Sequence, residues 1–258
     1  MQTVSLIVPV YRAEAWIEEC MASIRAQTYK DIELIVIDDA QGSGAAAARN
    51  RGLDKATGEF VAFCDADDYL EPNAIRDMMD HIGFGADMVC GSFRKFGNFE
   101  AIVTAPTGAM QMRHVAEYAM SNLLDPRNNQ MLSGCWAKLF RRNLVGRFPL
   151  IQTAEDMAFN FDCLTRCGHV KFISDLVYHN RKRNGSLTTT FNEGDKPALF
   201  GFLQGLKYVK RFLSPFYKDE QIDDAIDNSK MYHGMLYFSR ICAQDGGTMR
   251  DVLRKLYP

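Results

Sequence analysis

Short apolar runs alternate with segments of helical periodicity through the first third of the chain. Apolar runs at 3–11, 32–38, 59–64 and 86–93 are typical of buried strands. Segments at 13–27, 44–56 and 71–82 separate them and carry apolar residues at the spacing of a helix. This alternation predicts an α/β fold with a mostly parallel central sheet flanked by helices.

The later pattern is less regular. It predicts strands at 100–105 and 169–180 and a helix at 112–124. From about residue 195 the spacing is helical, most clearly at 199–213 and 223–244. We therefore predict one α/β domain over residues 1–190 and a helical C-terminal extension over 191–258.

Acidic residues follow two of the predicted strands. Asp38 and Asp39 end the second strand, and Asp65, Asp67 and Asp68 follow the third. In parallel sheets ligands bind beyond the carboxyl ends of the strands, so both groups are expected in one crevice. Crowded carboxylates cost free energy unless a cation or hydrogen-bond donors lie among them. Carboxylate oxygens suit Mg²⁺ or Mn²⁺, although Asp is also common in a polar turn before a helix.

Composition excludes several classes of protein. The chain has 258 residues, of which 47% are hydrophobic and 24% charged, as in ordinary globular proteins. A net charge of −2 argues against nucleic acid as a partner. The seven cysteines form no CxxC pair, which favours reduced thiols and a cytoplasmic location. No apolar run approaches the length of a membrane span, so any membrane contact would be peripheral, at the inner face.

Several motifs together resemble one enzyme family. "VSLIVPVYRAEAWIEECMASIRAQTYKDIELIVIDDA" and "AARNRGLDKATGEFVAFCDADDYLEPNAI" are similar to the family 2 inverting glycosyltransferases, and "CWAKLFRR", "AEDMAFNFDCL" and "YHNRKRNGSLT" extend the likeness to about Thr188. The resemblance implies the GT-A fold of nucleotide-diphospho-sugar transferases. It also implies transfer of a sugar from a UDP-sugar to a hydroxyl of a glycan or lipid-linked glycan, in a bacterial surface polysaccharide pathway.

The resemblance also implies roles for individual residues. Tyr11 would face the uracil and Asp39 would bind the uracil N–H. Asp65 and Asp67 would hold Mn²⁺ or Mg²⁺ on the diphosphate, with His179 either a third ligand or a diphosphate donor. The full set implied for the nucleotide-sugar is Pro9, Tyr11, Asp38, Asp39, Arg49, Asp65, Ala66, Asp67, Arg181 and Ser186.

The resemblance implies a catalytic role for the segment "TAEDMAF", residues 153–159. Asp156 would take the proton from the acceptor hydroxyl, with Glu155 in support, because an inverting transfer needs one base. The alternative is that Thr153 and Asp156 form a capping box at a helix start. Trp136 and Lys138 match the acceptor side of the family, although core packing would also explain the tryptophan.

One loop departs from the family and opens another interpretation. Only "QGSG" separates "IDDA" from "AARNRG", where most relatives are longer, so the details of uracil recognition at Asp39 are in doubt. Gly42, Gly44 and Ala47 fit a G-x-G-x-x-A dinucleotide motif, but the preceding aspartates would repel a pyrophosphate. A non-catalytic nucleotide-sugar or glycan-binding protein is the other alternative.

Residues 181–218 are rich in basic and aromatic side chains. Eight Lys and Arg residues face only Glu193 and Asp195 in this segment. The segment is either a surface for anionic lipid or a helix with a solvated basic face that covers the core.

Overall fold

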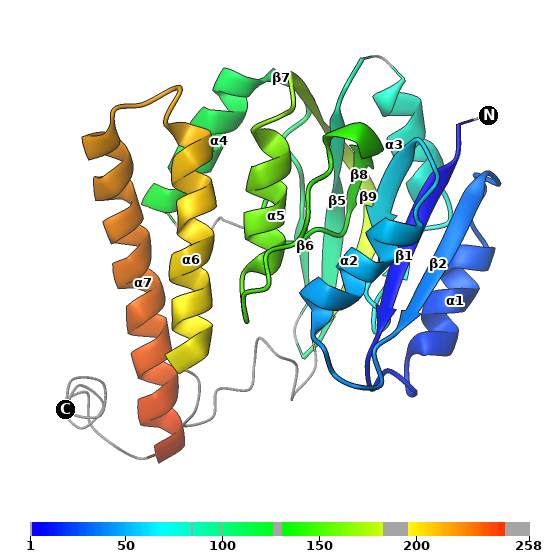
Figure 1. Ribbon diagram of the computed structural model, residues 1–258, viewed down its shortest axis with the longest axis horizontal. Helices are drawn as coiled ribbons and strands as arrows, with labels where there is room; N and C mark the ends of the chain where they lie inside the picture. Colours follow the sequence, from blue (N-terminus) through cyan, green and yellow to red (C-terminus); the bar gives the residue numbers. More distant parts are fainter. Residues whose placement is uncertain (1, 84, 99, 126–130, 183–195, 246–258) are drawn as a thin grey trace.

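The computed structural model describes residues 2–83, 85–98, 100–125, 131–182 and 196–245, which form a layered α/β structure (Figure 1). Its sheet runs in the order β2 (Ile32–Asp38), β1 (Val4–Val10), β3 (Phe60–Phe63), β8 (Lys138–Arg141), β5 (Met88–Gly97), β9 (His169–Lys182) and β4 (Tyr69–Leu70). Two short strands lie off this path, β6 (Ala101–Val103) beside β5 and β7 (Gly108–Gln111) beside β9.

The sheet is mixed. Strand β1 pairs in parallel with β2 and β3, and β5 pairs in parallel with β9. Strand β8 runs antiparallel between β3 and β5, and β4, β6 and β7 are also antiparallel to their neighbours. The parallel character that we predicted therefore holds for the first three strands and for β5 with β9. Strand β8 was not predicted, because its four residues are too few to show a period.

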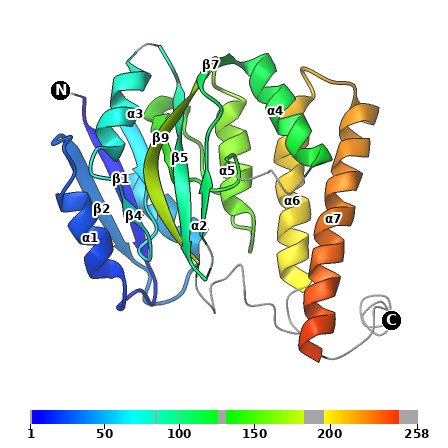
Figure 2. The ribbon, with the colours of Figure 1, turned by 180° about the vertical axis from the view of Figure 1, so that it is seen from behind.

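Helices cover both faces of the sheet, as predicted. Helices α2 (Ala45–Lys55) and α5 (Glu155–Leu164) lie on the face toward the viewer in Figure 1. Helices α1 (Ile17–Arg25) and α3 (Ala74–Ile82) lie on the opposite face, which Figure 2 turns forward. Helix α3 begins at Ala74, two residues later than the predicted start at Pro72. A short 3₁₀ turn, Arg142–Leu144, follows β8.

The predicted C-terminal helices are present and pack on the rest of the structure. Helix α6 (Lys196–Leu213) contacts α5, and α7 (Asp219–Asp245) contacts α4 (Met112–Leu124). The predicted boundary at residue 190 lies outside the described residues. None of the helices in the described ranges combines the length and apolar character that crossing a bilayer requires.

Helix α2 packs tightly on β1 near the C-terminal end of the helix. A Cβ on Gly52 would lie 2.4 Å from Ile7 Cγ2, so only glycine allows this approach. Beneath α5, Phe148 and Phe159 stack with ring centres 3.8 Å apart, and Phe63 of β3 meets both rings edge-on. These contacts fix α2, β3 and α5 relative to one another.

Candidate active site

The carboxyl ends of β1, β2 and β3 meet at one edge, and the acidic residues follow directly. Asp39 comes after β2, and its backbone N–H donates to the carbonyl of Val10 on β1 at 2.8 Å. Asp65, Asp67 and Asp68 follow β3. Both acidic groups therefore lie at the edge where the sequence placed them.

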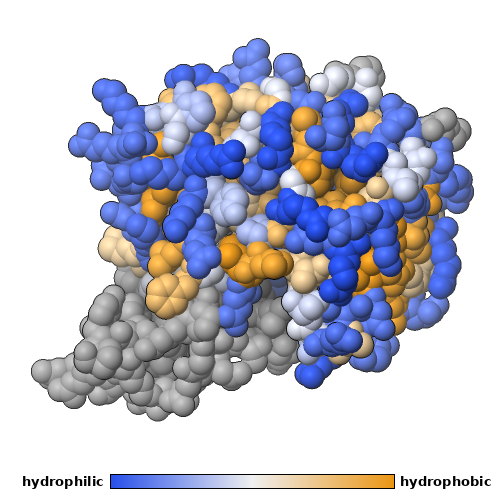
Figure 3. All heavy atoms as spheres, viewed as in Figure 1, coloured by the Kyte–Doolittle hydropathy of each residue, from blue (hydrophilic) through white to orange (hydrophobic). Residues whose placement is uncertain are grey.

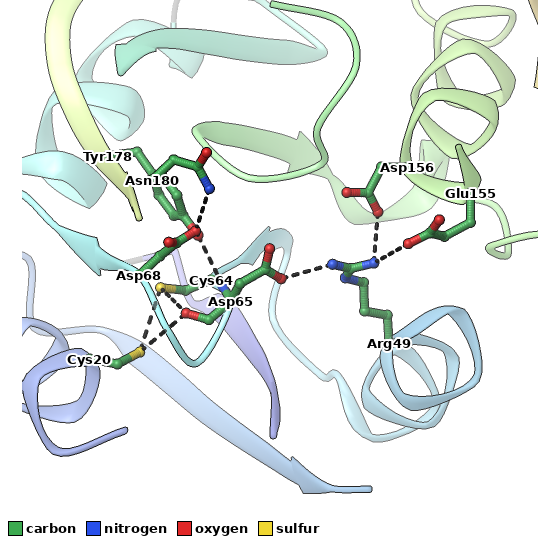
Figure 4. A network of polar contacts seen from close by, with 9 residues as sticks. All are labelled: Cys20, Arg49, Cys64, Asp65, Asp68, Glu155, Asp156, Tyr178 and Asn180. Atoms are coloured by element: carbon green, nitrogen blue, oxygen red, sulfur yellow. Dashed lines mark hydrogen bonds and ion pairs between the residues drawn. The ribbon is translucent and has the colours of Figure 1, made fainter. Parts of the chain in front are cut away.

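Arg49 joins the loop of residues 65–68, called the aspartate loop below, to the start of α5 (Figure 4). Its Nη2 donates to Asp65 Oδ1 at 2.8 Å, and its Nη1 donates to Asp156 Oδ1 at 2.7 Å and to Glu155 Oε1 at 3.1 Å. The guanidinium is buried, and the three carboxylates keep 17–25% of their side-chain surface exposed. One cation thus contacts both Asp65, for which the family resemblance implied metal binding, and Glu155 and Asp156, for which it implied catalysis.

Burial and crowding set the charge state of this cluster. Burial and the neighbouring carboxylate of Asp156 raise the pKa of Glu155 to about 7, against a lowering effect of Arg49. Burial also raises the pKa of Asp156, although Arg49 and hydrogen bonds from Cys135 oppose it. Burial alone would disfavour the charged guanidinium, yet Asp156 and the other carboxylates hold the pKa of Arg49 above its ordinary value. Burial therefore favours the protonated form of both carboxyl groups, and Arg49 opposes this effect at each.

Helix α5 presents this pair without a capping box. The residue before the helix, Ala154, has left-handed backbone angles (φ 60°) and occupies the cap position that the capping box would give to Thr153. The register of the helix start thus differs by one residue from that of the capping box. Asp156 instead accepts hydrogen bonds from Arg49 and Cys135.

Asp68 is a structural residue beneath the aspartate loop. Its carboxylate accepts hydrogen bonds from the Tyr178 hydroxyl at 2.7 Å, Asn180 Nδ2 at 2.9 Å and the backbone N–H of Arg181 at 2.7 Å. Burial, with Asp65 and Asp67 nearby, raises its pKa to about 8. The crowding seen in the sequence is relieved here by hydrogen-bond donors from β9 and, at Asp65, by Arg49.

The predicted acceptor-side residues lie between these groups. Trp136 stacks on Tyr178 with ring centres 5.0 Å apart, and the Tyr178 hydroxyl accepts the backbone N–H of Asp65 at 3.0 Å. The Lys138 ammonium is buried and donates to the carbonyl of Gly134 at 2.6 Å. Trp136 is therefore partly exposed beside the aspartates, whereas Lys138 supports the backbone that carries it.

Arg181 lies against the aspartate loop, and His179 does not. Arg181 Nε donates to the carbonyl of Asp67 at 2.9 Å, and its guanidinium also pairs with Glu19. His179 Nε2 lies 2.5 Å from Glu71 Oε1, and its ring stacks on Tyr69, away from Asp65. Within the described ranges, no three His, Cys, Asp or Glu side chains gather closely enough to hold a metal ion. Ser186 lies outside the described residues.

The uracil end of the predicted site is altered by the short loop. The Asp39 carboxylate accepts hydrogen bonds from Ser43, from the backbone N–H of Gly44 at 2.9 Å and from Arg51 at 2.7 Å. Burial would raise the pKa of Asp39, but these hydrogen bonds hold it below its ordinary value. The glycine loop thus binds its own aspartate, which counts against a pyrophosphate site there.

The other residues predicted for the nucleotide lie around this loop. Tyr11 is 45% exposed, and its ring lies beside Gly42. Asp38 is exposed and accepts the backbone N–H of Ala40 at 2.9 Å. Pro9 is the penultimate residue of β1, and Ala66 is buried between the two loop aspartates.

Sequence reasoning missed two residues of the site. Tyr178 bridges the aspartate loop and Trp136, and Cys135 binds Asp156. The available signal was the family resemblance itself, since Cys135 and Tyr178 are the first residues of two of the segments that carry it.

Comparisons with known proteins bear on the family and the fold of this chain. The model of "Glycosyl transferase family 2" matches residues 5–43 and 40–146, more than half of the chain. The chain belongs to glycosyl transferase family 2. Among solved structures, Staphylococcus aureus TarS 1–349 in complex with UDP-GlcNAc superposes with a TM-score of 0.66 at 20% identity, covering 88% of this chain and 71% of that one. The predicted GT-A fold is confirmed.

Several bacterial relatives are similar over most of this chain. EpsJ of Bacillus subtilis, named an uncharacterized glycosyltransferase, is 28% identical over 242 residues, covering 78% of this chain and 66% of EpsJ. The glycosyltransferase GlyA of Streptococcus pneumoniae is 27% identical over 222 residues, covering 74% of this chain and 32% of GlyA. TuaG of Bacillus subtilis, named for teichuronic acid biosynthesis, is 26% identical over 236 residues, covering 80% and 90%. The chain spans 32–66% of the length of the first curated relatives that it matches.

Proposed function

We propose that this family 2 member is a metal-dependent inverting glycosyltransferase that moves a sugar from a UDP-sugar to a hydroxyl of a glycan or lipid-linked glycan. The observation that carries this proposal is the shared contact of Asp65, Glu155 and Asp156 with Arg49. Arg49 thus links Asp65, which we assign to the donor, to Asp156, which we assign to proton transfer.

Asp156 is the proposed base. It takes the proton of the acceptor hydroxyl as that oxygen forms a bond to the anomeric carbon, and the bond from this carbon to the UDP oxygen breaks with its electron pair going to UDP. Attack opposite the leaving group inverts the configuration, so no covalent intermediate on the enzyme is needed. Glu155 and Arg49 hold Asp156 in place and tune its affinity for the proton.

Asp65 and Asp67 fit a divalent ion in their chemistry. Mg²⁺ and Mn²⁺ prefer hard oxygen ligands, and Mg²⁺ usually takes only one or two carboxylates with water and phosphate oxygens completing the shell. A third protein ligand is therefore not required, which agrees with the different placement of His179. When bound, the ion would offset negative charge on the departing diphosphate.

The donor and the setting follow by analogy. TarS was solved with UDP-GlcNAc and TuaG is named for teichuronic acid biosynthesis, which supports a UDP-sugar donor and a bacterial surface polysaccharide. We place the enzyme in the cytoplasm, where it would meet a lipid-linked acceptor at the inner membrane face.

Membrane contact has limited support from the surface. Lys210 pairs with Asp223 of α7 and Arg211 lies near Asp162, so two of the basic side chains have acidic neighbours. Figure 3 shows mostly hydrophilic side chains over the upper part of helices α6 and α7.

Turnover and binding assays test the proposal. We expect the wild-type protein to be stabilised by UDP with Mn²⁺ in a thermal-shift assay and to release UDP from one member of a UDP-sugar panel when an acceptor is present. Asp156→Asn should lower turnover about 100-fold or more and keep UDP binding. The exposed Asp224→Asn is the control.

Each other outcome has a distinct meaning. Failure of UDP with Mn²⁺ to stabilise the wild-type protein would refute the proposed donor. Binding without turnover across the panel would favour a non-catalytic binding protein. Unchanged turnover in Asp156→Asn would remove that residue as the base.

A further inference from the structure

Two lysines lie on the same side of strands β5 and β9 as Trp136. Side chains alternate along a strand, so Lys182 shares a face with Asn180 and Tyr178 on β9. On β5, Lys95 shares a face with Phe93, and the register places Lys95 opposite Asn180. The Lys95 ammonium lies 5.9 Å from the Phe93 ring centre, and Phe93 meets Trp136 edge-on at 4.6 Å.

The charge of Lys182 disfavours the charged form of Lys95. Burial and the charge of Lys182 lower the pKa of Lys95 to about 8. Burial also lowers the pKa of Lys182, and the aspartates 68, 65 and 67 partly offset that effect. Two half-buried like charges on one face cost free energy that a bound anion would relieve.

Between the lysines, Asn180 offers an unused hydrogen-bond acceptor. Its side chain is 8% exposed and its Nδ2 donates to Asp68, as Figure 4 shows. Its Oδ1 is buried and has no hydrogen-bond partner among the described residues. A sugar hydroxyl could donate to this oxygen, so the lysines and the asparagine together suit a sugar that carries an acidic group.

The position of Lys95 separates this feature from the diphosphate site. Strand β5 lies on the side of β9 away from β4, the short strand that follows the aspartate loop. Lys182 lies on β9, and Lys95 lies on β5, the strand that also carries Phe93, which contacts Trp136. The anion that they bind would thus lie on the acceptor side of the crevice.

We propose, on the basis of the function proposed above, that the acceptor is an acidic glycan whose carboxylate or phosphate is bound by Lys95 and Lys182 while a neighbouring hydroxyl donates to Asn180. The lysines act as specificity residues for the acceptor and take no part in the chemical step.

Ligand binding to the UDP- and Mn²⁺-loaded protein tests this assignment. The acidic probes are methyl β-D-glucuronide and glucose 6-phosphate. The neutral probe is methyl β-D-glucoside, in which a hydroxymethyl group replaces the carboxylate of the glucuronide. Dissociation constants are measured by NMR titration. We expect at least one acidic probe to bind about 10- to 100-fold more tightly than the neutral glucoside, as for hydrogen bonds to charged groups. Which acidic probe binds better distinguishes a carboxylate from a phosphate.

Variants show which residues produce the preference for acidic probes. The double variant Lys95→Gln/Lys182→Gln should lose it, and Lys171→Gln, at the other end of β9, should keep it. If the double variant does not fold, each single variant should weaken the acidic probe about tenfold.

Three results would overturn the inference: equal binding of acidic and neutral probes, a preference that survives in the lysine variants, or an equal loss of UDP affinity, which would assign the lysines to the diphosphate. Affinity for UDP is measured separately in each protein. A protein that binds UDP with no acid preference refutes only this inference, whereas one that does not bind UDP refutes the proposed function.

Discussion

Replacing Arg49 by methionine tests the electrostatic core of the site. The substitution keeps a long side chain but removes the cation that contacts all three carboxylates, Asp65, Glu155 and Asp156. Removing one partner of a buried ion pair costs about 3–5 kcal/mol. The carboxylates are 17–25% exposed, which favours the lower end, about 3 kcal/mol. For a chain of this size, that corresponds to a fall of roughly 6–12 °C in the midpoint of thermal unfolding.

The loss should depend on pH in a defined direction. Without Arg49, the pKa values of Glu155 and Asp156 rise further above those of the unfolded chain, because Arg49 lowers both. A carboxyl whose pKa is raised by folding contributes stability at low pH and loses it as pH rises through the folded pKa. The gap in unfolding midpoint between wild type and Arg49→Met should therefore be larger at pH 8 than at pH 5.

Thermal unfolding monitored by circular dichroism at the two pH values measures both effects. The control is Arg147→Met, which removes an arginine from an exposed pair with Asp54 and should change the midpoint little. Equal shifts for Arg49→Met and Arg147→Met, or a gap that shrinks toward pH 8, would refute this account of the cluster.

Three further predictions concern neighbouring residues. Tyr178→Phe removes the hydroxyl that joins Asp65 to Asp68 and should lower the free energy of unfolding, measured with urea, by about 1–3 kcal/mol. The control Tyr217→Phe, near α6, should not lower it. Equal losses in the two variants would show that the Tyr178 bridge adds no stability. Gly52→Ala drives a methyl group into Ile7 and should cost about 1–3 kcal/mol, whereas Gly83→Ala, whose nearest neighbour is 3.8 Å away, should be nearly neutral. Because the pKa of Glu155 is about 7 in the folded protein and 4.5 as a free group, wild type should lose up to about 3 kcal/mol between pH 4.5 and 7, and Glu155→Gln should remove that part of the slope.

Periodicity and residue chemistry were sufficient to place most of the site. The strands that carry the acidic residues are continuous apolar runs, so their ends, and hence Asp39 and Asp65, could be located without coordinates. The helices of the C-terminal part also follow a clear period. Strand β8 could not be found in this way, since its pairing with β3 and β5 arises from tertiary contacts over four residues.

The hydrogen-bond and ion-pair partners of polar side chains were less predictable from sequence than the ends of the strands. His179 and Arg181 are two residues apart on β9 and share a face, and both contact Phe96. Their polar partners still differ, because His179 pairs with Glu71 whereas Arg181 pairs with Glu19 and the carbonyl of Asp67. Arg49 was expected at the nucleotide, but its link to α5 joins residues more than 100 positions apart. Asp68 looked like a turn residue in sequence, and only the fold brings three donors to it.

Because Asp65, Glu155 and Asp156 share the guanidinium of Arg49, ligand binding at Asp65 is coupled to proton binding at Glu155 and Asp156. A ligand that draws Asp65 away from Arg49 would leave the positive charge to Glu155 and Asp156, and their affinity for protons would fall. By linkage, loss of a proton from that pair would in turn strengthen binding of the same ligand at Asp65. Donor loading would then prepare the base before the acceptor arrives, through one side chain and without movement of the backbone.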